Sequence, residues 1–383
     1  MRRGRPSLQE KVAFLSDRRS YADCPRRVAT VETHFAWVFL TARHAYKLKK
    51  PVRQARMDYR TLASRERGCR EELRLNRRLA PTVYQSVVPL MTRRGTLALG
   101  KGERVEDWLI KMRRLSAAGM LDCALGRGEV GRRQLDRIVA TLVRFFRQAE
   151  SNPVHGAQYV ASLRRQVRDN ARAFRKYGAR LPQGLVTEVA AAQLAVIRAA
   201  AGALAARGAR VVEGHGDLRA EHVHVGSPVA IIDCLEFDRA LRLLDPAEEI
   251  ALLALEVERL GHAPFADELA RRFFSSSRDP VPPVVFEFYK SQRAATRAKV
   301  AAWHLDDPQF TDKRPWIARA RSLLADALRH ARAALNVLEP RELRSAGRRP
   351  ALKQGRERRA RQNARHRIPE QRSDGKYGEA VAR

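Results

Sequence analysis

Cysteine is scarce in this 383-residue chain, and long apolar runs are absent. Four cysteines, Cys24, Cys69, Cys123 and Cys234, are widely separated and form no CxxC pair, which argues against a disulfide framework or a zinc site. No apolar run approaches the roughly 20 residues that cross a bilayer, and the N-terminal arginines lead only into the short VAFL. We therefore expect a cytoplasmic protein without a membrane span or a secretory signal.

Acidic residues are also few, with 42 Asp and Glu against 75 Lys and Arg and a formal net charge of +33. Such a charge favours contact with nucleic acid, anionic membrane surfaces or phosphorylated ligands. Because lysine is a small share of the basic residues and alanine is abundant, a compositional bias of the genome explains the arginine excess equally well. In the basic C-terminal stretch, Tyr377 and His366 are the only rings, which leaves little for base stacking.

The first hundred residues have the pattern of strands and turns around one helix. Segments 33–40 (THFAWVFL) and 44–50 (HAYKLKK) predict an antiparallel pair. Apolar residues at helical spacing predict a helix over 61–79, which Pro81 ends. Three more strand-like segments follow between glycine turns: YQSVVPLMT, GTLALG and ERVEDWLIKM. We expect a small antiparallel sheet with one helix.

From Leu115 onward the pattern is mainly helical. Helices are expected over 135–150, 186–207, 246–260, 282–304 and 316–338, and one β-rich island, 210–237, interrupts them. Beyond Leu338 large apolar residues almost disappear, so we expect a disordered basic tail over 339–383. The chain has no internal repeat and no GxxxxGK[ST] phosphate loop.

The β-rich island carries the most specific chemistry. It contains EGHGDLRAEH (213–222) and VAIIDCLEF (229–237), and a turn at Gly226, Ser227 and Pro228 joins two short strands between them. A hairpin here makes Asp217 and Asp233 spatial neighbours. Two adjacent carboxylates need a compensating cation or proton, which predicts a hard metal such as Mg²⁺ with Asp233 as its ligand and Asp217 as a proton acceptor.

These motifs resemble a known arrangement. HGDLRAEH is similar to the HxDxxxxN catalytic loop of the aminoglycoside phosphotransferase and choline kinase-like branch of the protein-kinase fold, IIDCLEF to its metal-binding strand end, and LDPAEEIA (244–251) to its GDPxxDLA segment. Upstream, ETHFAWVFL, AYKLKKPV, EELRLNRRLAP and VVP resemble the N-lobe of a bacterial subgroup, some of whose members carry a C-terminal phosphate-loop ATPase domain that has no counterpart here. The resemblance covers roughly residues 8 to 338.

The resemblance implies a nucleotide site in the N-terminal part. Lys47, in the A-x-K pattern, corresponds to the strand lysine that neutralises ATP phosphates, and Glu72 to the helix glutamate that pairs with it. Lys49 shares the strand face of Lys47 and Glu71 adjoins Glu72, so either assignment could shift. A solvated charged strand is the alternative interpretation.

The nucleotide base and phosphates would meet other parts of the same lobe. Adenine is expected near the strand end at Met112 and Arg113, through backbone contacts. The hairpin that would cover the phosphates has no glycine between its strands, so Thr33 or His34 could supply side-chain donors instead.

In the catalytic loop the resemblance makes Asp217 the residue that orients and deprotonates the acceptor hydroxyl, His215 a loop-holding residue and Asp233 the metal ligand. His222 stands where the family has asparagine as a second metal ligand. Imidazole suits Mg²⁺ poorly and tolerates Mn²⁺ or zinc, so metal binding is altered, catalysis is lost, or His222 hydrogen-bonds Asp217 or a substrate.

The acceptor is left open because two charge patterns oppose each other. One helical face is basic and would suit an acidic or phosphorylated acceptor: Lys290, Arg293 and Arg297. A second group is acidic and would suit a cationic acceptor such as an amino sugar: Glu236, Asp238 and Asp245.

The sequence therefore predicts an α+β, two-lobed, protein-kinase-like fold. Residues 1–112 would form the N-lobe, 113–338 the helical C-lobe with the catalytic hairpin, and 339–383 the tail. The leading hypothesis is an ATP- and Mg²⁺-dependent phosphotransferase acting on a hydroxyl of a small molecule. The alternative is a catalytically inactive kinase-like module that binds nucleic acid or acidic partners through its basic surface and tail.

Overall fold

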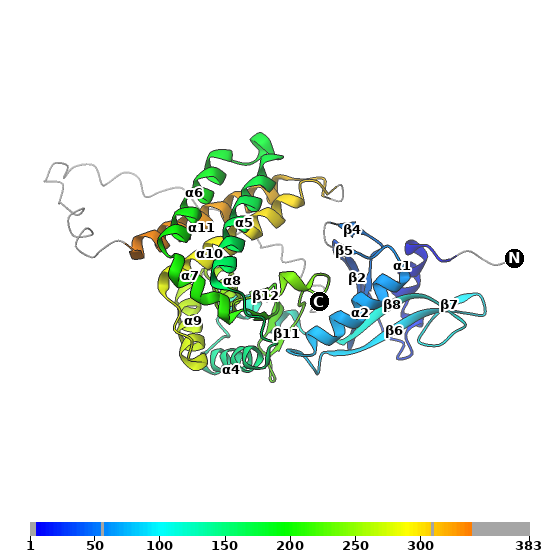
Figure 1. Ribbon diagram of the computed structural model, residues 1–383. Coiled ribbons are helices and arrows are strands. Elements are labelled where there is room, and N and C mark those ends of the chain that lie inside the picture. The colour runs from blue at the N-terminus through cyan, green and yellow to red at the C-terminus, as the bar shows by residue number, and fades with distance from the viewer. Residues whose placement is uncertain (1–4, 55–56, 308–309, 339–383) are drawn as a thin grey trace, which may run out of the picture.

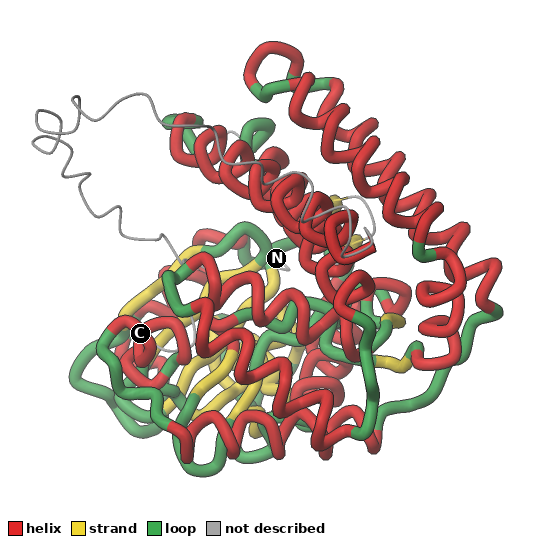
Figure 2. Tube along the Cα trace, turned by 90° about the vertical axis from the view of Figure 1, so that its left-hand side faces the viewer, coloured by secondary structure: helices red, strands yellow, loops and turns green. Residues whose placement is uncertain are grey.

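The computed structural model describes residues 5–54, 57–307 and 310–338 (Figure 1). Figure 1 shows strands gathered in one part of the molecule and long helices in another, and in Figure 2 the helical part lies in front of the strands. The predicted division into a sheet-bearing N-lobe and a helical C-lobe is therefore confirmed. The predicted tail, 339–383, lies outside the described residues.

The N-lobe is built on an antiparallel sheet of six strands in the order β1-β2-β3-β8-β6-β7. The strands are β1 (Ala29–Glu32), β2 (Ala36–Leu40), β3 (His44–Lys49), β6 (Tyr84–Arg93), β7 (Thr96–Leu99) and β8 (Arg104–Arg113). A two-stranded pair, β4 (Arg53–Gln54) and β5 (Met57–Asp58), follows β3. The two expected strands around the first hairpin are confirmed as β2 and β3.

Helix α2 (Leu62–Asn76) packs across this sheet. It begins at Thr61, whose hydroxyl accepts a hydrogen bond from the Ser64 amide at 3.1 Å. Its buried face repeats at helical spacing through Cys69, Glu72 and Asn76, so the helix turns one carboxylate inward with its apolar residues. A further helix, α1 (Leu8–Ser16), precedes the sheet and was not expected from the sequence.

The C-lobe consists of packed helices: α3 (Leu121–Gly126), α4 (Arg132–Gln148), α5 (Gly156–Arg175), α6 (Gln183–Ala199), α7 (Ala201–Arg207), α8 (Pro246–Arg259), α9 (Ala263–Ser277), α10 (Pro283–Trp303) and α11 (Arg314–Leu338). Helices α10 and α11 pack along their length and α8 packs against α10. Nearly all of α8 is buried, which makes it the central helix of this lobe. Helices α5 and α9 were not expected from the sequence.

The single helix expected over 186–207 is two helices, α6 and α7, with an 84° bend between Gln183–Ala199 and Ala201–Arg210. The bend buries Leu204 and Arg207, so that the arginine reaches carboxylates inside the lobe. Among the described residues no single helix has the length and apolar character needed to span a membrane, and only this bent pair meets those criteria jointly.

Two short pairs of strands lie where the lobes meet. Strand β9 (Val212–Glu213) pairs with β12 (Leu243–Leu244), and β10 (Val223–His224) pairs with β11 (Ala230–Ile231), all antiparallel. Figure 1 places β11 and β12 between the sheet and the helices. The predicted hairpin of the β-rich island is thereby confirmed, although its strands are only two residues long. It carries the segments of Asp217 and Asp233 to the junction of the lobes.

Candidate active site

A lysine on β3 and a glutamate on α2 form an ion pair at the junction of the lobes. Lys47 Nζ lies 2.9 Å from Glu72 Oε1, and the Glu72 side chain is fully buried. Glu71 faces the other way, where Arg74 donates to it at 2.7 Å and Arg242 at 3.3 Å. The rotation of α2 therefore selects Glu72, not Glu71, as the residue that faces the sheet.

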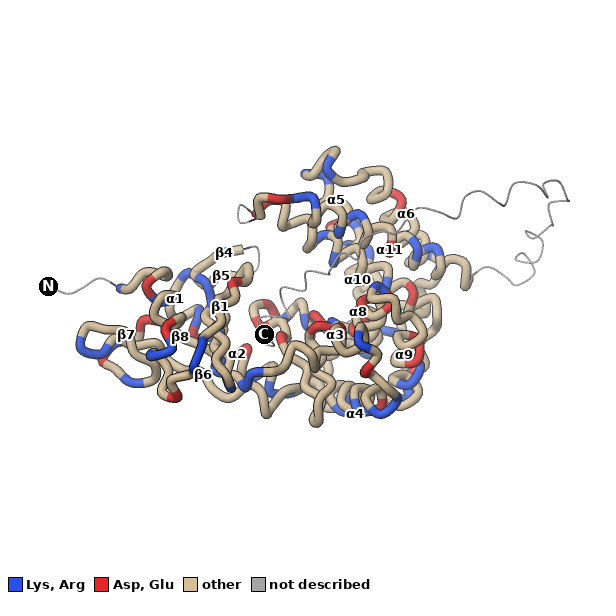
Figure 3. Tube along the Cα trace, turned by 180° about the vertical axis from the view of Figure 1, so that it is seen from behind, with Lys and Arg blue, Asp and Glu red and all other residues tan. Residues whose placement is uncertain are grey.

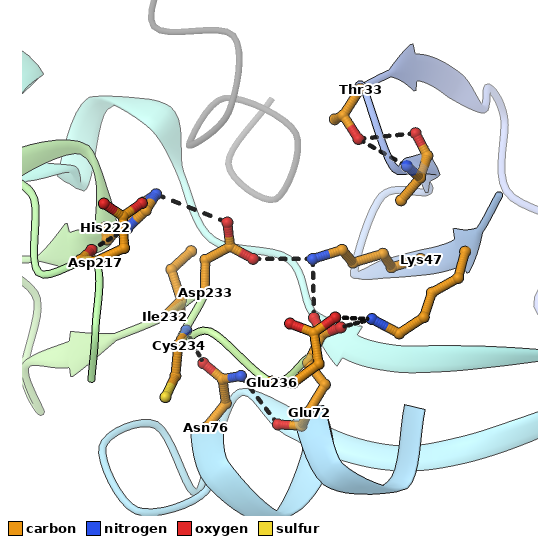
Figure 4. A network of polar contacts seen from close by, with 12 residues as sticks. Thr33, Lys47, Glu72, Asn76, Asp217, His222, Ile232, Asp233, Cys234 and Glu236 are labelled. Atoms are coloured by element: carbon orange, nitrogen blue, oxygen red, sulfur yellow. Dashed lines mark hydrogen bonds and ion pairs between the residues drawn. The ribbon is translucent and has the colours of Figure 1, made fainter. Parts of the chain in front are cut away.

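A second lysine on the same strand shares this glutamate. Lys49 Nζ lies 2.5 Å from the other carboxylate oxygen of Glu72 and also donates to Glu236, to which Tyr59 donates at 2.7 Å. Burial alone would lower the pKa of Lys49, but Glu236 and Glu72 raise it well above its ordinary range. Lys49 is thus a charged, buried link between N-lobe and C-lobe, whereas Lys47 is the lysine that faces Asp233 (Figure 4).

Asp233 ends the β11 segment in a left-handed conformation, with φ of 63°. Its Oδ1 lies 2.9 Å from Lys47 Nζ, and its amide donates to the Tyr84 hydroxyl at 3.3 Å. The next amide, of Cys234, donates to Asn76 Oδ1 at 3.0 Å. Burial would raise the pKa of the Asp233 carboxyl, but Lys47 holds it well below its usual range. Contacts from α2 and β6 therefore fix an ionised carboxylate beside the lysine.

The loop before Asp217 is held by buried polar contacts. His215 is fully buried, and burial lowers its pKa to about 3, so the ring is neutral. Its Nε2 donates to the Ile232 carbonyl at 2.9 Å and its Nδ1 accepts from the Asp217 amide at 3.3 Å. Glu249, from α8, accepts from the amides of His215 and Gly216. This geometry suits the predicted loop-holding role of His215.

Asp217 lies among arginines. Arg219 Nε donates to Asp217 Oδ2 at 2.9 Å, and Arg297 Nη1 lies 3.9 Å from Asp217 Oδ1. Burial would raise the pKa of Asp217, but Arg219 and Arg297 hold it well below its usual range. Arg219, itself buried, also forms an ion pair with Glu221 and donates to His222 Nε2 at 2.9 Å.

These hydrogen bonds fix the tautomer of His222. A guanidinium only donates, so His222 Nε2 accepts from Arg219, and Nδ1–H donates to the Asp217 carbonyl at 2.9 Å. The Nε2 lone pair is therefore occupied, and Nε2 lies 3.8 Å from Asp233 Oδ2. The predicted metal-ligand role of His222 does not fit this arrangement, whereas the predicted alternative of a hydrogen bond to Asp217 does, through the backbone.

The site offers few protein ligands for a divalent cation. No group of three or more His, Cys, Asp or Glu side chains that could hold a metal occurs within the described part of the chain. Asp233 offers one carboxylate at the expected position, beside Lys47. Mg²⁺ typically binds through one or two carboxylates together with substrate phosphates and water, so a single protein carboxylate fits such a cation when a nucleotide accompanies it.

The two residues expected to meet the nucleotide base lie inside β8. Met112 is buried and pairs with Ala45 on one side and Tyr84 on the other, and the Arg113 amide donates to the Val83 carbonyl at 2.8 Å. The Arg114 amide donates in turn to the Arg43 carbonyl at 2.9 Å, so the pairing of this backbone continues one residue beyond β8. Contact of Met112 and Arg113 with a nucleotide base stays a prediction.

The residues expected to cover the phosphates have other partners. The Thr33 hydroxyl donates to the Ala36 carbonyl at 2.9 Å and accepts from the Ala36 amide at 3.0 Å, which closes the turn between β1 and β2 (Figure 4). His34 lies 2.6 Å from Asp307 through Nδ1 and 3.1 Å from Gln54 through Nε2. The tip of this hairpin thus touches the connection between α10 and α11.

Most of the residues considered for the acceptor are engaged elsewhere. Lys290 forms ion pairs with two glutamates, and Asp245 is fully buried under Arg207 at 2.6 Å. Asp238 caps a short 3-10 turn. Arg293 contacts the catalytic loop itself, donating to the Gly216 carbonyl at 3.3 Å. The residues of the predicted acidic group thus have partners within the protein, and only part of the basic stripe reaches Asp217.

Sequence reasoning missed several residues that build the site. Arg219 is the cation in contact with Asp217, Asn76 anchors the turn after Asp233, and Glu249 supports the loop. One signal was available for Asn76, which stands four residues after Glu72 and so shares its helix face. Nothing in the spacing identified Arg219 or Glu249, because their contacts depend on how loop and helix meet.

No protein-family model matches the chain. Uncharacterized proteins of Mycobacterium tuberculosis and Mycobacterium bovis are 32% identical to it over 310 residues, which cover 78% of this chain and 57% of each relative. The chain thus spans little more than half the length of the curated relatives it matches.

Among solved structures, the GDP complex of wild-type aminoglycoside 2'-phosphotransferase-IIIa matches with a TM-score of 0.50 at 13% identity, over 84% of this chain and 99% of that one. A choline/ethanolamine kinase family protein from Mesorhizobium loti has a TM-score of 0.47 at 14% identity, over 85% and 99% of the two chains. The chain has the fold of the first of these, and the predicted two-lobed kinase-like fold is confirmed.

Proposed function

We propose that this chain, with its small-molecule phosphotransferase fold, moves the γ-phosphoryl group of ATP to a hydroxyl of a small molecule. One observation carries the proposal: Lys47 is paired at 2.9 Å with both Glu72 and Asp233, and Asp233 Oδ2 lies 3.8 Å from the ring of His222, which hydrogen-bonds the Asp217 carbonyl. A fixed cation, a carboxylate and a proton acceptor thus come together from three separate segments. The related fold has been solved with a bound nucleotide, GDP, which supports a nucleotide here.

On the donor side, Lys47 would bind the phosphates, and the buried Glu72 would hold its flexible side chain in place. Asp233 would hold a divalent cation, Mg²⁺ or Mn²⁺, which when bound neutralises charge on the transferring phosphoryl group. The base would lie against the backbone at the end of β8, around Met112 and Arg113. Lys47, Glu72 and Asp233 would thus hold charges in fixed positions around the phosphates, which is the main requirement of phosphoryl transfer.

On the acceptor side, Asp217 would orient the hydroxyl and accept its proton. The hydroxyl oxygen forms a bond to the γ-phosphorus, the bond from that phosphorus to the β,γ-bridging oxygen breaks, and ADP leaves. Arg219 and Arg297 hold the pKa of Asp217 well below its usual range, so the carboxylate is ionised at neutral pH and ready to accept a hydrogen bond. Such a weak base suits proton transfer late in the reaction.

The alternative is a catalytically inactive module that binds polyanions. The occupied lone pair of His222 favours it, because a second metal ligand is then lacking. Figure 3 shows Lys and Arg positions throughout both lobes, interspersed with Asp and Glu, which gives no particular support for one nucleic-acid face.

The two functions are separated by measuring ADP formation from ATP with Mg²⁺ or Mn²⁺ and pooled small-molecule alcohols. The proposal predicts turnover that Asp217→Asn lowers by roughly 10²-fold or more, on the scale of general-base catalysis. Deletion of 339–383 should leave turnover unchanged. Absence of turnover in every pool, together with steeply salt-dependent RNA binding that the deletion removes, would instead establish the inactive module.

A further inference from the structure

A basic groove lies between helices α4 and α9, and its lining shares no residue with the candidate active site. The two helices pack side by side (Figure 1), and a cavity of about 690 Å³ opens between them. Its base is apolar, because the lining includes the buried Val139 and Val143 and the small, exposed Ala140. Around this base the two helices contribute five arginines: Arg132, Arg144, Arg147, Arg271 and Arg272.

The arginines of this groove outnumber its carboxylates. Asp136 is the one acidic residue that the described part of the chain contributes to the lining, and it is already paired with Arg272. The side chains of Arg132 and Arg144 are exposed and have no hydrogen bond or ion pair with any residue that the structure describes. Each guanidinium carries five donors, so an anion in the groove would find several of them unoccupied.

The groove is longer than a small anion. Arg132 and Arg147 stand at opposite ends of α4, about 22 Å apart at 1.5 Å per residue. Arg147 also donates to the Ser276 carbonyl of α9 at 2.9 Å, which joins the two helices at that end. A single phosphate or carboxylate covers a small part of this length, whereas an extended peptide of about seven residues covers all of it. The groove therefore fits an anionic polymer.

The lining favours an acidic peptide over other anionic polymers. Among the described residues no aromatic side chain lines the groove, so nucleic-acid bases would have no ring on which to stack. The apolar base would instead contact aliphatic side chains of a peptide while the arginines bind its carboxylates. The net charge of +33 argues against a second copy of this chain, or its own basic residues 339–383, as the occupant.

We propose that the groove between α4 and α9 binds an acidic segment of a partner protein, with carboxylates on the arginines and an aliphatic side chain against Ala140. Clusters of arginine recognise acidic motifs in many peptide-binding proteins, because the guanidinium fork matches a carboxylate in geometry and charge. The inference does not depend on phosphoryl transfer, since the groove and the candidate active site have no residue in common.

The first test measures binding of a fluorescent peptide of about ten residues, mostly glutamate with valines at its centre, by fluorescence anisotropy. The double variant Arg132→Gln/Arg144→Gln should bind it roughly tenfold more weakly than wild type, because it loses charge-assisted hydrogen bonds. The matched control is Arg133→Gln/Arg137→Gln, which removes the same charge from exposed positions of the same helix outside the lining. Melting temperatures check that both variants fold. Equal losses in the two variants, or no binding to wild type at low salt, would overturn the proposal.

The second test locates the bound peptide. A benzophenone on the peptide is activated by light, and mass spectrometry maps the crosslinks, which should fall within 132–148 and 271–276. A peptide with serines in place of the valines should crosslink more weakly, because the apolar contact is lost. Crosslinks confined to other segments, such as 339–383, would refute the groove as the site. A single-stranded RNA of equal charge that binds more tightly and displaces the peptide would refute an acidic protein segment as its ligand.

Discussion

Lys47 and Lys49 lie on the same strand and share Glu72, but they differ in burial. A comparison of variants at the two positions therefore tests the role assigned to each lysine. We compare Lys47→Met with Lys49→Met, which remove charge while keeping an unbranched side chain. Lys49 is 2% exposed and pairs with Glu72 at 0% and Glu236 at 11%. Lys47 is 15% exposed, and its partner Asp233 is 28% exposed.

The difference in burial between the two lysines predicts that Lys49→Met mainly lowers stability and that Lys47→Met mainly lowers turnover. Lys49→Met leaves two buried carboxylates short of a partner, so its free energy of unfolding should fall by about 3–5 kcal/mol. Lys47→Met should cost only about 1–2 kcal/mol, because Glu72 keeps Lys49 and Asp233 can be hydrated. Lys47→Met should instead lower turnover by roughly 10²–10³-fold, because this substitution removes the cation proposed to bind the phosphates.

Urea unfolding gives the first quantity, and nucleotide-dependent shifts in melting temperature and ADP formation give the second. Lys49→Arg serves as the control that keeps the charge if Lys49→Met does not fold. A Lys47→Met protein that binds and turns over nucleotide like wild type would refute the assignment of Lys47. So would equal stability losses in both variants, because burial would then not distinguish the two pairs.

Three further changes test other parts of the structure. Arg207→Met should destabilise the C-lobe by about 3–5 kcal/mol in urea, because Asp245 and Asp279 lose their buried partner; an unchanged midpoint would contradict the pairing. Asn76→Ala should cost about 1–3 kcal/mol and weaken nucleotide binding, since it leaves a buried amide after the Asp233 turn unsatisfied; stable protein with full affinity would argue against that anchor. His330 is buried between two glutamates whose hydrogen bonds, against the effect of burial, raise its pKa, so its stabilisation is complete below about pH 6.5 and fades as the pH rises through the folded pKa. The stability gap between wild type and His330→Gln should therefore be larger at pH 6 than at pH 9, and a gap that grows with pH would have the wrong sign.

The sequence was informative where a single local pattern determines the structure. Alternation in 33–50 predicted the hairpin of β2 and β3, and the acidic end of VAIID predicted a carboxylate at the lobe junction. It could not choose between Glu71 and Glu72, because adjacent residues on a helix differ only by its rotation, which packing against the sheet decides.

The sequence did not predict which residues from different segments contact one another. His222 was expected to bind metal because of its position in a motif, but Arg219 occupies its lone pair, and a tautomer depends on both neighbours of the ring. Asp245 was considered as part of an acidic group for a cationic acceptor. Instead it caps α8 and lies under Arg207, a residue 38 positions away whose approach requires the bend between α6 and α7.

The most direct test of the account is ³¹P NMR of ATP incubated with the protein, a divalent cation and alcohols of each charge. The account predicts that the γ-phosphorus signal declines as a new phosphate-monoester signal appears with wild type, and that Asp217→Asn produces it far more slowly. ATP that stays intact with every alcohol, or a new ester that forms equally fast with Asp217→Asn, would contradict it.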